Sequence, residues 1–495
     1  MRRSQSDRPL VLLYNPRAAY HTMPLGLVAI GSALDRERFD VRIIDGRLVP
    51  DGVEALRPHL ERALCLGVSV LTGAPIADAL VVSRAVKALR PDLPIIWGGW
   101  HPSLFPTDCL AEAGVDVTVQ AQGESTMREI AQRLADGAAP HELAGVQGCA
   151  HRVDASAGST IVLNPPRPLI AAEALPAHDY ALIDVESYFA KKRLRQVDYI
   201  TSYGCHFRCD FCADPFVYAR QWTGLSPARI VAELTALHRT HPFDDVSFQD
   251  ETFFTHVERV TTMAEGLLSA GHAFSWAGTL RADQAARLSD ADLALCRRSG
   301  LRRVLIGVEA GSQAMLDWMH KDIRLEQVLD AAERCRDLGI AVQFPFIVGF
   351  PGESDASVRA SLSFAARLRL MSPAFETPVF YFKPYPGSSI TREAVRSGFQ
   401  LPESLADWAA FDIQRGAGPW VSARIYRRVE RFKRLSGLAW RPRGGWRRPF
   451  AALARSSLRR WARAGAAAGA GVVAPLSTAP STPLPARVDD APPAR

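Results

Sequence analysis

The chain has 495 residues, more than a single hydrophobic core usually serves. Hydrophobic residues make up 47% and charged residues 22%, which excludes general disorder and predicts two or three globular domains. Eight cysteines are too few for a disulfide-rich secreted scaffold, and we find neither a signal peptide nor an apolar run of 18 residues. We therefore expect a cytoplasmic protein with reduced thiols.

The net charge of +7 is distributed unevenly. Residues 415–495 contain 17 Lys and Arg against three acidic residues, a net charge of +14, which leaves −7 on residues 1–414. The basic character of the protein therefore comes from its carboxyl-terminal part, whereas the rest of the chain is acidic.

Short apolar segments alternate with amphipathic ones over residues 8–143. The expected strands are 10–14, 41–44, 64–69, 94–97 and 115–119, and the expected helices are 25–34, 76–89 and 124–134. Strands that are apolar on both faces and separated by helices predict a doubly wound, flavodoxin-like parallel sheet of the α/β class. Ligands of such sheets bind beyond the carboxyl ends of the strands.

A second alternating series follows a Pro-containing stretch, 144–192, which we expect to be a linker. Its expected strands are 197–201, 246–249, 273–278, 303–306, 341–348 and 377–382, with helices such as 227–238, 257–268, 325–338 and 355–368 between them. Six regularly spaced units predict a partial (β/α)6 barrel over 193–400, with reactive groups at the carboxyl ends of its strands.

The rest of the chain changes character. Residues 401–463 predict a basic, mostly helical region, and the Ala/Pro/Ser/Thr-rich segment 464–495 predicts a disordered tail. Within 424–435, apolar residues form one stripe among arginines. Such a helix docks on the barrel, lies on an anionic membrane surface or binds nucleic acid. Docking is the commonest outcome and peripheral membrane contact through 424–463 the next. No nucleic acid is expected as a partner, since we recognise no RNA-binding module in this region.

Three of the eight cysteines lie close together after the first strand of the second series. Cys205, Cys209 and Cys212 have the spacing CxxxCxxC on a loop at the expected reactive rim. Three thiolates can bind three irons of a [4Fe–4S] cluster and leave the fourth iron open to another ligand. The alternatives are incidental thiols or a zinc knuckle that includes His206, although adjacent Cys205 and His206 reach one tetrahedral ion with difficulty. The other five cysteines predict packing roles: Cys65, Cys109, Cys149, Cys296 and Cys335.

This motif, with the aromatic Phe211 before its last cysteine, resembles the radical S-adenosylmethionine (SAM) superfamily. The resemblance implies that Cys205, Cys209 and Cys212 hold a [4Fe–4S] cluster whose open iron binds the amino and carboxylate groups of SAM. Reductive cleavage of SAM then gives a 5′-deoxyadenosyl radical that abstracts hydrogen from a small-molecule substrate. An electron donor such as flavodoxin or ferredoxin supplies the electron.

The resemblance also implies SAM-binding residues around the rim. Phe211 is expected near the adenine, Asp250 and Glu251 near the methionyl amine, and Arg281 at the carboxylate. Each has a plainer alternative: a helix amino-terminal cap for the acidic pair, and a solvated surface ion pair for Arg281.

Two further segments match the superfamily pattern. The turn after the fourth strand contains Glu309 and Ser312, and its carboxylate is expected at the ribose hydroxyls. An acidic residue among apolar neighbours is costly without a partner. The segment that closes the fifth strand contains Ile347 and Gly349 and resembles the adenine-contacting segment, although a strand-to-helix turn explains its glycines too.

The first domain resembles the cobalamin-binding domain fused to many radical SAM enzymes. Such domains carry D-x-H-x-x-G, then S-x-L, then G-G. Here Ser69 and Leu71 end the third strand, and Gly98 and Gly99 end the fourth, as the pattern requires.

The first element of that pattern departs from the family, because Arg47 stands where the cobalt-binding histidine would be. Arginine stays protonated and cannot donate a lone pair to cobalt. Loss of this histidine is common in the radical SAM branch, so cobalamin remains the expected cofactor. The alternative is a degenerate domain that binds no cofactor. His101, after the Gly-Gly pair, is expected to be loop structure.

Together the resemblances imply a cobalamin-dependent radical SAM C-methyltransferase, similar to hopanoid and natural-product methylases. It would act on an unactivated carbon of a lipid-like or natural-product substrate. A non-methylating oxidation, cyclisation or rearrangement is the alternative, as in the anaerobic Mg-protoporphyrin ester cyclase group. A different class is a non-catalytic iron–sulfur or cobalamin sensor with a nucleic-acid-binding basic tail.

Overall fold

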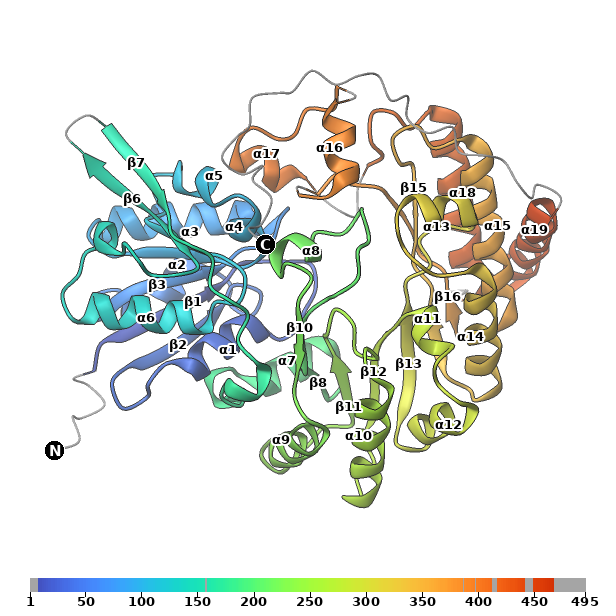
Figure 1. The fold of residues 1–495 in the computed structure, drawn as a ribbon, viewed down its shortest axis with the longest axis horizontal. Coiled ribbons are helices and arrows are strands. Elements are labelled where there is room, and N and C mark those ends of the chain that lie inside the picture. Colours follow the sequence, from blue (N-terminus) through green and yellow to red (C-terminus); the bar gives the residue numbers. More distant parts are fainter. Residues whose placement is uncertain are drawn as a thin grey trace.

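The computed structural model describes residues 8–155, 158–385, 387–396, 398–411, 416–440 and 448–466. The tail predicted to be disordered, 464–495, lies outside these residues except for its first three, which end the last helix. Two mainly parallel sheets lie side by side, the first in blue and the second in green to yellow (Figure 1).

The first sheet has seven strands in the order β2-β1-β3-β4-β5-β6-β7. Its parallel strands are β1 (Leu10–Asn15), β2 (Asp40–Asp45), β3 (Ala63–Ser69), β4 (Ile95–Gly98) and β5 (Val117–Val119). Its helices are α1 (Leu25–Ala33), α2 (Gly52–Leu56), α3 (Pro75–Leu89), α4 (Trp100–Leu104), α5 (Pro106–Leu110) and α6 (Glu124–Ala135). Apolar clusters cover both faces of the sheet, as the unbroken apolar strands predict.

Part of the stretch predicted to be a linker is regular. Strands β6 (Cys149–Ala155) and β7 (Gly158–Leu163) form an antiparallel hairpin that extends the first sheet beyond β5. This hairpin lies at the sheet edge and lacks the apolar runs of the central strands. Its polar composition resembles that of a loop.

The second sheet has six parallel strands in the order β16-β14-β13-β12-β11-β8. They are β8 (Gln196–Tyr199), β11 (Asp245–Phe248), β12 (Ser275–Leu280), β13 (Leu301–Ile306), β14 (Ala341–Gln343) and β16 (Phe375–Glu376). The predicted strand 341–348 is divided: β15 (Phe346–Val348) pairs instead with β17 (Val379–Tyr381). Next to the cysteines, β9 (Ser202–Gly204) and β10 (Trp222–Gly224) form a short antiparallel ribbon.

Most helices of this unit cover the outer face of its sheet, as in a partial (β/α) barrel, whereas α8 (Asp214–Val217) lies on the side of the first domain, where it packs near α4 (Figure 1). The helices of the unit are α7 (Val185–Lys192), α8 (Asp214–Val217), α9 (Pro227–Thr240), α10 (Val257–Ser269), α11 (Ala282–Ala285), α12 (Asp290–Arg298), α13 (Gln313–Trp318), α14 (Leu325–Asp337) and α15 (Asp355–Met371). The α/β fold class predicted from the sequence is confirmed.

The carboxyl-terminal helices are α16 (Ser389–Arg396), α17 (Leu405–Ala410), α18 (Ala423–Trp440) and α19 (Arg448–Ala466). Helix α19 packs against α15 and α18, and α17 returns to pack on α3 of the first domain. The buried side chains Val429, Phe432 and Leu458 show that the apolar stripe of this region docks on the barrel. Within the described residues, no helix combines the length and apolar character needed to cross a membrane.

Candidate active site between the two sheets

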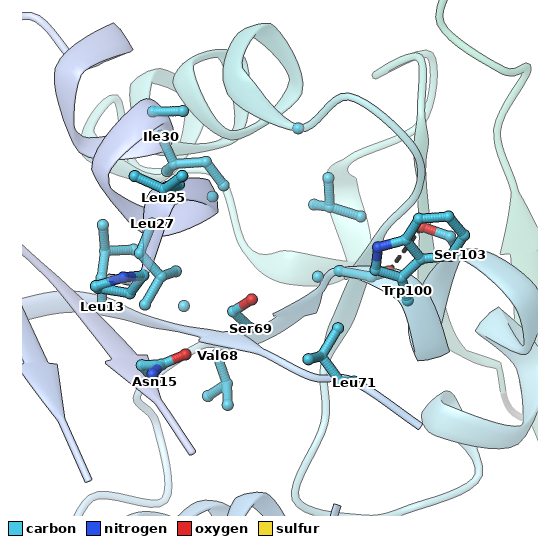
Figure 2. Close-up of a pocket in the computed structure, with 18 of the residues that line it drawn as sticks. Leu13, Asn15, Leu25, Leu27, Ile30, Val68, Ser69, Leu71, Trp100 and Ser103 are labelled. Atoms are coloured by element: carbon cyan, nitrogen blue, oxygen red, sulfur yellow. Dashed lines mark hydrogen bonds between the residues drawn. The ribbon is translucent and has the colours of Figure 1, made fainter. Parts of the chain in front are cut away.

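A cavity of about 350 Å³ lies where the carboxyl ends of both sheets face one another. The first sheet contributes the ends of β1, β3, β4 and β5, and Figure 2 shows Asn15, Ser69, Leu71 and Trp100 around it. The barrel contributes Tyr203, Gln249 and Glu251 among others. The reactive ends of two separate α/β units therefore share one cavity, as expected for ligands of such sheets.

The four residues predicted for cofactor binding in the first domain all line this cavity: Ser69, Leu71, Gly98 and Gly99. Gly99 has a φ of 98°, in the left-handed region. A Cβ atom there would lie 3.0 Å from the carbonyl oxygen and 3.2 Å from the nitrogen of Val70. Only glycine fits this position without strain. Small residues thus keep this wall of the cavity open for a bulky ligand.

Arg47, at the position of the missing histidine, also lines the cavity. Its guanidinium forms an ion pair with Asp45 at 2.6 Å, and both side chains are almost fully buried. The hydroxyl of Tyr188 donates to the same carboxylate, and Arg47 donates to the carbonyl oxygen of Tyr20 at 3.2 Å. Burial acts to lower the pKa of Arg47, but Asp45 raises it above its ordinary value. The residue is therefore a fixed cation and not a metal ligand.

His101 is fully buried and is absent from the lining of the cavity. Its Nδ1 lies 3.2 Å from the hydroxyl of Thr72, and its ring contacts Phe105 and Trp408. Burial lowers its pKa to about 4, so the ring is neutral. His101 thus packs the junction between α4 and α17.

The cysteine loop, residues 205–212, follows the β9 strand on the barrel side. Cys209 is buried, and Cys205 and Cys212 are partly exposed. Burial raises the pKa of Cys205 to about 11, and burial together with Asp214 and the other two thiols raises that of Cys212 further. The three sulfurs are thus close enough to influence one another, and metal binding would hold them as thiolates.

The zinc alternative has less support from the geometry. Among the described residues, no group of three or more His, Cys, Asp or Glu side chains is arranged to hold a single metal ion. The ring of His206 is exposed and packs on Phe207 with ring centres 4.3 Å apart. Three thiols without a fourth protein donor are the donor set that an iron–sulfur cluster with one open iron requires.

Arg281 is buried, which contradicts the surface ion-pair alternative. It donates to the carbonyl oxygen of Lys321 at 2.6 Å and to Asp283 at 2.9 Å. Its remaining nitrogen lies 3.7 Å from the sulfur of Cys209, and its guanidinium lies 3.6 Å from the ring centre of Phe207. Arg281 therefore holds a positive charge beside the cysteine loop.

Glu309 has a φ of 66°, which is unusual for a residue other than glycine. Its carboxylate lies 2.7 Å from the ammonium of Lys321, and both side chains are buried. Burial acts to lower the pKa of Lys321, but Glu309 and the Cys209 thiol raise it above its ordinary value. Lys321 could not be predicted as a site residue from the sequence, because a single lysine between the polar residues His320 and Asp322 carries no motif.

Phe211 is partly buried, with its ring centre 5.6 Å from the ammonium of Lys321. Ile347 donates its N–H to the carbonyl oxygen of Glu309 at 2.8 Å, which joins the two predicted SAM-binding segments. Gly349 has a φ of 78° and donates to Glu353 at 2.6 Å.

Ser312 precedes α13 at its amino-terminal cap position, and its side chain makes no capping hydrogen bond there. Phe211 and Glu309 both lie near Lys321, and Ile347 is hydrogen-bonded to Glu309. The rim segments that contain these three residues therefore meet on the same side of the barrel as the cysteine loop.

Asp250 and Glu251 differ in their surroundings. Asp250 is fully enclosed and accepts hydrogen bonds from the N–H and hydroxyl of Thr201 and from the hydroxyl of Ser202. It fixes the chain immediately before the cysteine loop. Glu251 lines the cavity, and one of its carboxylate oxygens is buried without a hydrogen-bond partner. Burial and Asp214 raise the pKa of Glu251 well above its ordinary value.

Replacing Asp250 by Ala should lower the free energy of unfolding by about 3 kcal/mol. The substitution leaves the buried donors of Thr201 and Ser202 unsatisfied, and each such group costs about 1–3 kcal/mol. Urea unfolding measures the change, and Asp330→Ala on the surface of α14 is the control, with an expected change within about 0.5 kcal/mol. Equal stability of the Asp250 variant and the wild type would show that this network is not structural.

Two known families match the chain in the regions of the two sheets. Residues 13–131 match the B12 binding domain, and residues 199–365 match the radical SAM superfamily. The chain is a radical SAM enzyme with an amino-terminal B12-binding domain. The two matched regions meet at the cavity, which takes residues from both.

Curated relatives of this radical SAM enzyme match a large part of the chain. An uncharacterized methyltransferase of Pyrococcus horikoshii is 27% identical over 79% of this chain and 82% of the relative. Cytidylyl-2-hydroxyethylphosphonate methyltransferase of Streptomyces wedmorensis is 24% identical, over 79% and 83%. The anaerobic magnesium-protoporphyrin IX monomethyl ester cyclase of Synechocystis is 28% identical, over 66% and 64%.

Solved structures share the fold. The radical SAM methyltransferase TsrM from Kitasatospora setae, with cobalamin and a [4Fe–4S] cluster bound, superposes with a TM-score of 0.68 at 17% identity. That match covers 92% of this chain and 99% of the other. The cobalamin-dependent radical enzyme OxsB, with aqua-cobalamin and SAM bound, has a TM-score of 0.62 at 21% identity, over 82% of this chain and 56% of the other.

Proposed function

We propose that this enzyme is a cobalamin-dependent C-methyltransferase that acts on an unactivated carbon of a lipid-like or natural-product small molecule. The observation that carries the proposal is the shared cavity, whose walls include the Gly98–Gly99 turn on one side and the segment before the cysteine loop on the other. A substrate carbon held there would lie between the two domains. TsrM and the Streptomyces wedmorensis relative, both methyltransferases, support methyl transfer as the reaction.

Separate groups of residues would bind the cluster and SAM. Cys205, Cys209 and Cys212 would hold the [4Fe–4S] cluster, and the SAM molecule would lie along the rim that contains Phe211 and Glu309. When bound, the cofactors supply the radical and methyl-transfer chemistry. The protein orients them and excludes water from the reacting groups.

Cobalamin would bind the wall formed by Ser69, Leu71, Gly98 and Gly99. Arg47 would face it as a charged, non-ligating residue, because its guanidinium is held by Asp45. Cobalt would then receive no protein ligand from this motif.

Anaerobic reconstitution with iron and sulfide, followed by SAM, hydroxocobalamin and a reductant, tests the proposal. We expect the enzyme to release 5′-deoxyadenosine and, in the presence of a methyl acceptor, S-adenosylhomocysteine. Formation of 5′-deoxyadenosine together with an unmethylated, oxidised or cyclised product would favour the reaction class of the magnesium-protoporphyrin cyclase relative. Absence of 5′-deoxyadenosine from folded, cluster-loaded protein would favour a non-catalytic sensor.

A reduced flavodoxin or ferredoxin is the proposed electron donor. We further propose that the enzyme is cytoplasmic and contacts the inner face of the membrane through α18 and α19. The supporting feature is a stripe of arginines on α18 at helical spacing, formed by Arg424, Arg427, Arg431 and Arg434. All four are exposed, and none forms an ion pair with a residue that the structure describes.

Exposed apolar residues on the same two helices also suit a lipid surface. Leu438 continues the stripe and is 37% exposed, while Phe450 and Leu453 of α19 are 52% and 65% exposed. Basic side chains beside exposed apolar ones are the pattern of a helix that lies in a membrane interface.

Replacing the four stripe arginines by Gln should reduce flotation with vesicles that contain phosphatidylserine by at least about tenfold, since each contributes about 1 kcal/mol near an anionic surface. The matched control replaces four exposed arginines elsewhere: Arg36, Arg239, Arg287 and Arg298. We expect the control variant to float like the wild type. Equal loss of flotation in both variants would show that net charge, and not the stripe, causes binding. Equal flotation of the stripe variant and the wild type would contradict membrane contact and show that α18 only docks on the barrel.

A further inference from the structure

Lys321 is a buried cation to which the proposed function gives no role. It lies in the short loop between α13 and α14, and the residues on either side, His320 and Asp322, have φ values of 48° and 54°. Such left-handed conformations are uncommon for residues other than glycine. The side chains of His320 and Asp322 are exposed, whereas that of Lys321 is only 8% exposed. The strained backbone thus turns one lysine inward.

This loop is fastened to the cysteine loop by several hydrogen bonds. The N–H of Asp210 donates to the carbonyl oxygen of Met319 at 3.0 Å, and the Asp210 carboxylate lies 2.6 Å from Nδ1 of His320. Arg208 donates twice to Asp322, at 2.8 and 2.9 Å. The inward cation therefore has a fixed place relative to the cysteines.

The ammonium of Lys321 has few partners of its own. Its Nζ lies 2.7 Å from the carboxylate of Glu309. An ammonium has three N–H donors, and Glu309 is the one acceptor that the described residues give to Lys321. Arg281 links it to the metal-binding sulfurs, since Arg281 donates to the carbonyl oxygen of Lys321 and lies 3.7 Å from the sulfur of Cys209. Two buried cations thus flank the cysteine loop on one side.

A buried charge acts on its neighbours more strongly than an exposed one, because water and salt screen it less. The reduction potential of an iron–sulfur cluster depends on nearby charge and on hydrogen bonds to its sulfurs. Uptake of one electron would make the cluster, together with its thiolates, one unit more negative, and a fixed cation beside them would stabilise that reduced state.

We propose that Lys321 holds a fixed positive charge beside the cysteine loop and thereby raises the reduction potential of the iron–sulfur cluster. The inference rests on the proposed function, since it requires the cluster. Lys321 would thus act through the cluster, by its charge, and would not itself react with the substrate.

The test is an anaerobic redox titration of the reconstituted enzyme without SAM, followed by electron paramagnetic resonance. At one fixed potential, Lys321→Met should lower the ratio of reduced to oxidised cluster by about tenfold, equivalent to about 59 mV for one electron. Arg324→Gln is the matched control, because it removes an exposed cation from the same loop as Lys321 and none of the hydrogen bonds that join this loop to the cysteine loop. We expect its ratio to stay at the wild-type value.

Glu309→Gln provides a second measurement with the opposite sign. It removes the carboxylate that compensates Lys321, so the ratio of reduced to oxidised cluster should rise. If the Lys321→Met protein does not retain its cluster, the ratio measured in Glu309→Gln tests the proposal instead. Unshifted ratios in variants with wild-type iron content would overturn this inference alone. A wild-type protein that takes up no iron and sulfide would overturn it together with the proposed function.

Discussion

Replacement of Cys209 by Ala should abolish the cleavage of SAM while the fold is retained. Cys209 is the buried member of the three cysteines, and its sulfur lies 3.7 Å from Arg281. Three thiolates are the minimum that anchors a four-iron cluster with one open iron, so two would hold it weakly. Loss of an outer-shell partner of a metal site already costs 10–100-fold, so loss of a ligand should lower the rate below about one hundredth of the wild-type value. Quantification of 5′-deoxyadenosine after anaerobic reconstitution measures this rate.

The matched control for Cys209→Ala is Cys296→Ala. Cys296 is a fully buried cysteine in α12 whose environment is purely one of packing. Its replacement leaves a small cavity and should reduce stability slightly while iron content and SAM cleavage remain at wild-type values. Retained SAM cleavage in the Cys209 variant would contradict the assignment of Cys209 as a ligand.

The central strands of the first sheet could be predicted from the sequence because burial on both faces leaves apolar runs. β1 and β3 are of this kind, and their predicted bounds agree with the structure within a few residues. The β6–β7 hairpin and the β9–β10 ribbon were missed. Both are short antiparallel pairs: β6–β7 extends the edge of the first sheet, and β9–β10 is a separate ribbon. Polar residues and glycines in them interrupt the apolar runs that mark the central strands.

The candidate site could be predicted where its residues form a motif along the chain. The cysteines and the Gly98–Gly99 turn are of this kind, because their spacing is local. Lys321 approaches the site only through the fold, from a loop that carries no recognisable pattern. Asp250 shows the opposite case: it stands in a motif position, yet its carboxylate is taken up by Thr201 and Ser202.

A single substitution in the cavity wall should separate cobalamin binding from folding. Gly98 lines the cavity, and a Cβ atom added to it would meet its nearest neighbour, Val119, at an ordinary contact distance of 3.8 Å. Gly98→Leu is therefore tolerated by the backbone, while its side chain occupies part of the 350 Å³ that a ligand would use. We expect the affinity for hydroxocobalamin to fall at least about tenfold, as expected when a bulky group fills a pre-formed pocket. Equilibrium titration followed by corrinoid absorbance measures the affinity.

Gly437→Leu serves as the control, because Gly437 lies on the exposed side of α18 with no atom within 4 Å of an added Cβ. It should bind hydroxocobalamin like the wild type. Thermal unfolding of both variants at wild-type temperatures would show that the loss in Gly98→Leu comes from the occupied cavity. Wild-type affinity in Gly98→Leu would mean that cobalamin does not bind against the Gly98–Gly99 turn. The methyl-transfer proposal would then lose the wall on which it depends, whereas the cysteine loop and SAM cleavage would be unaffected.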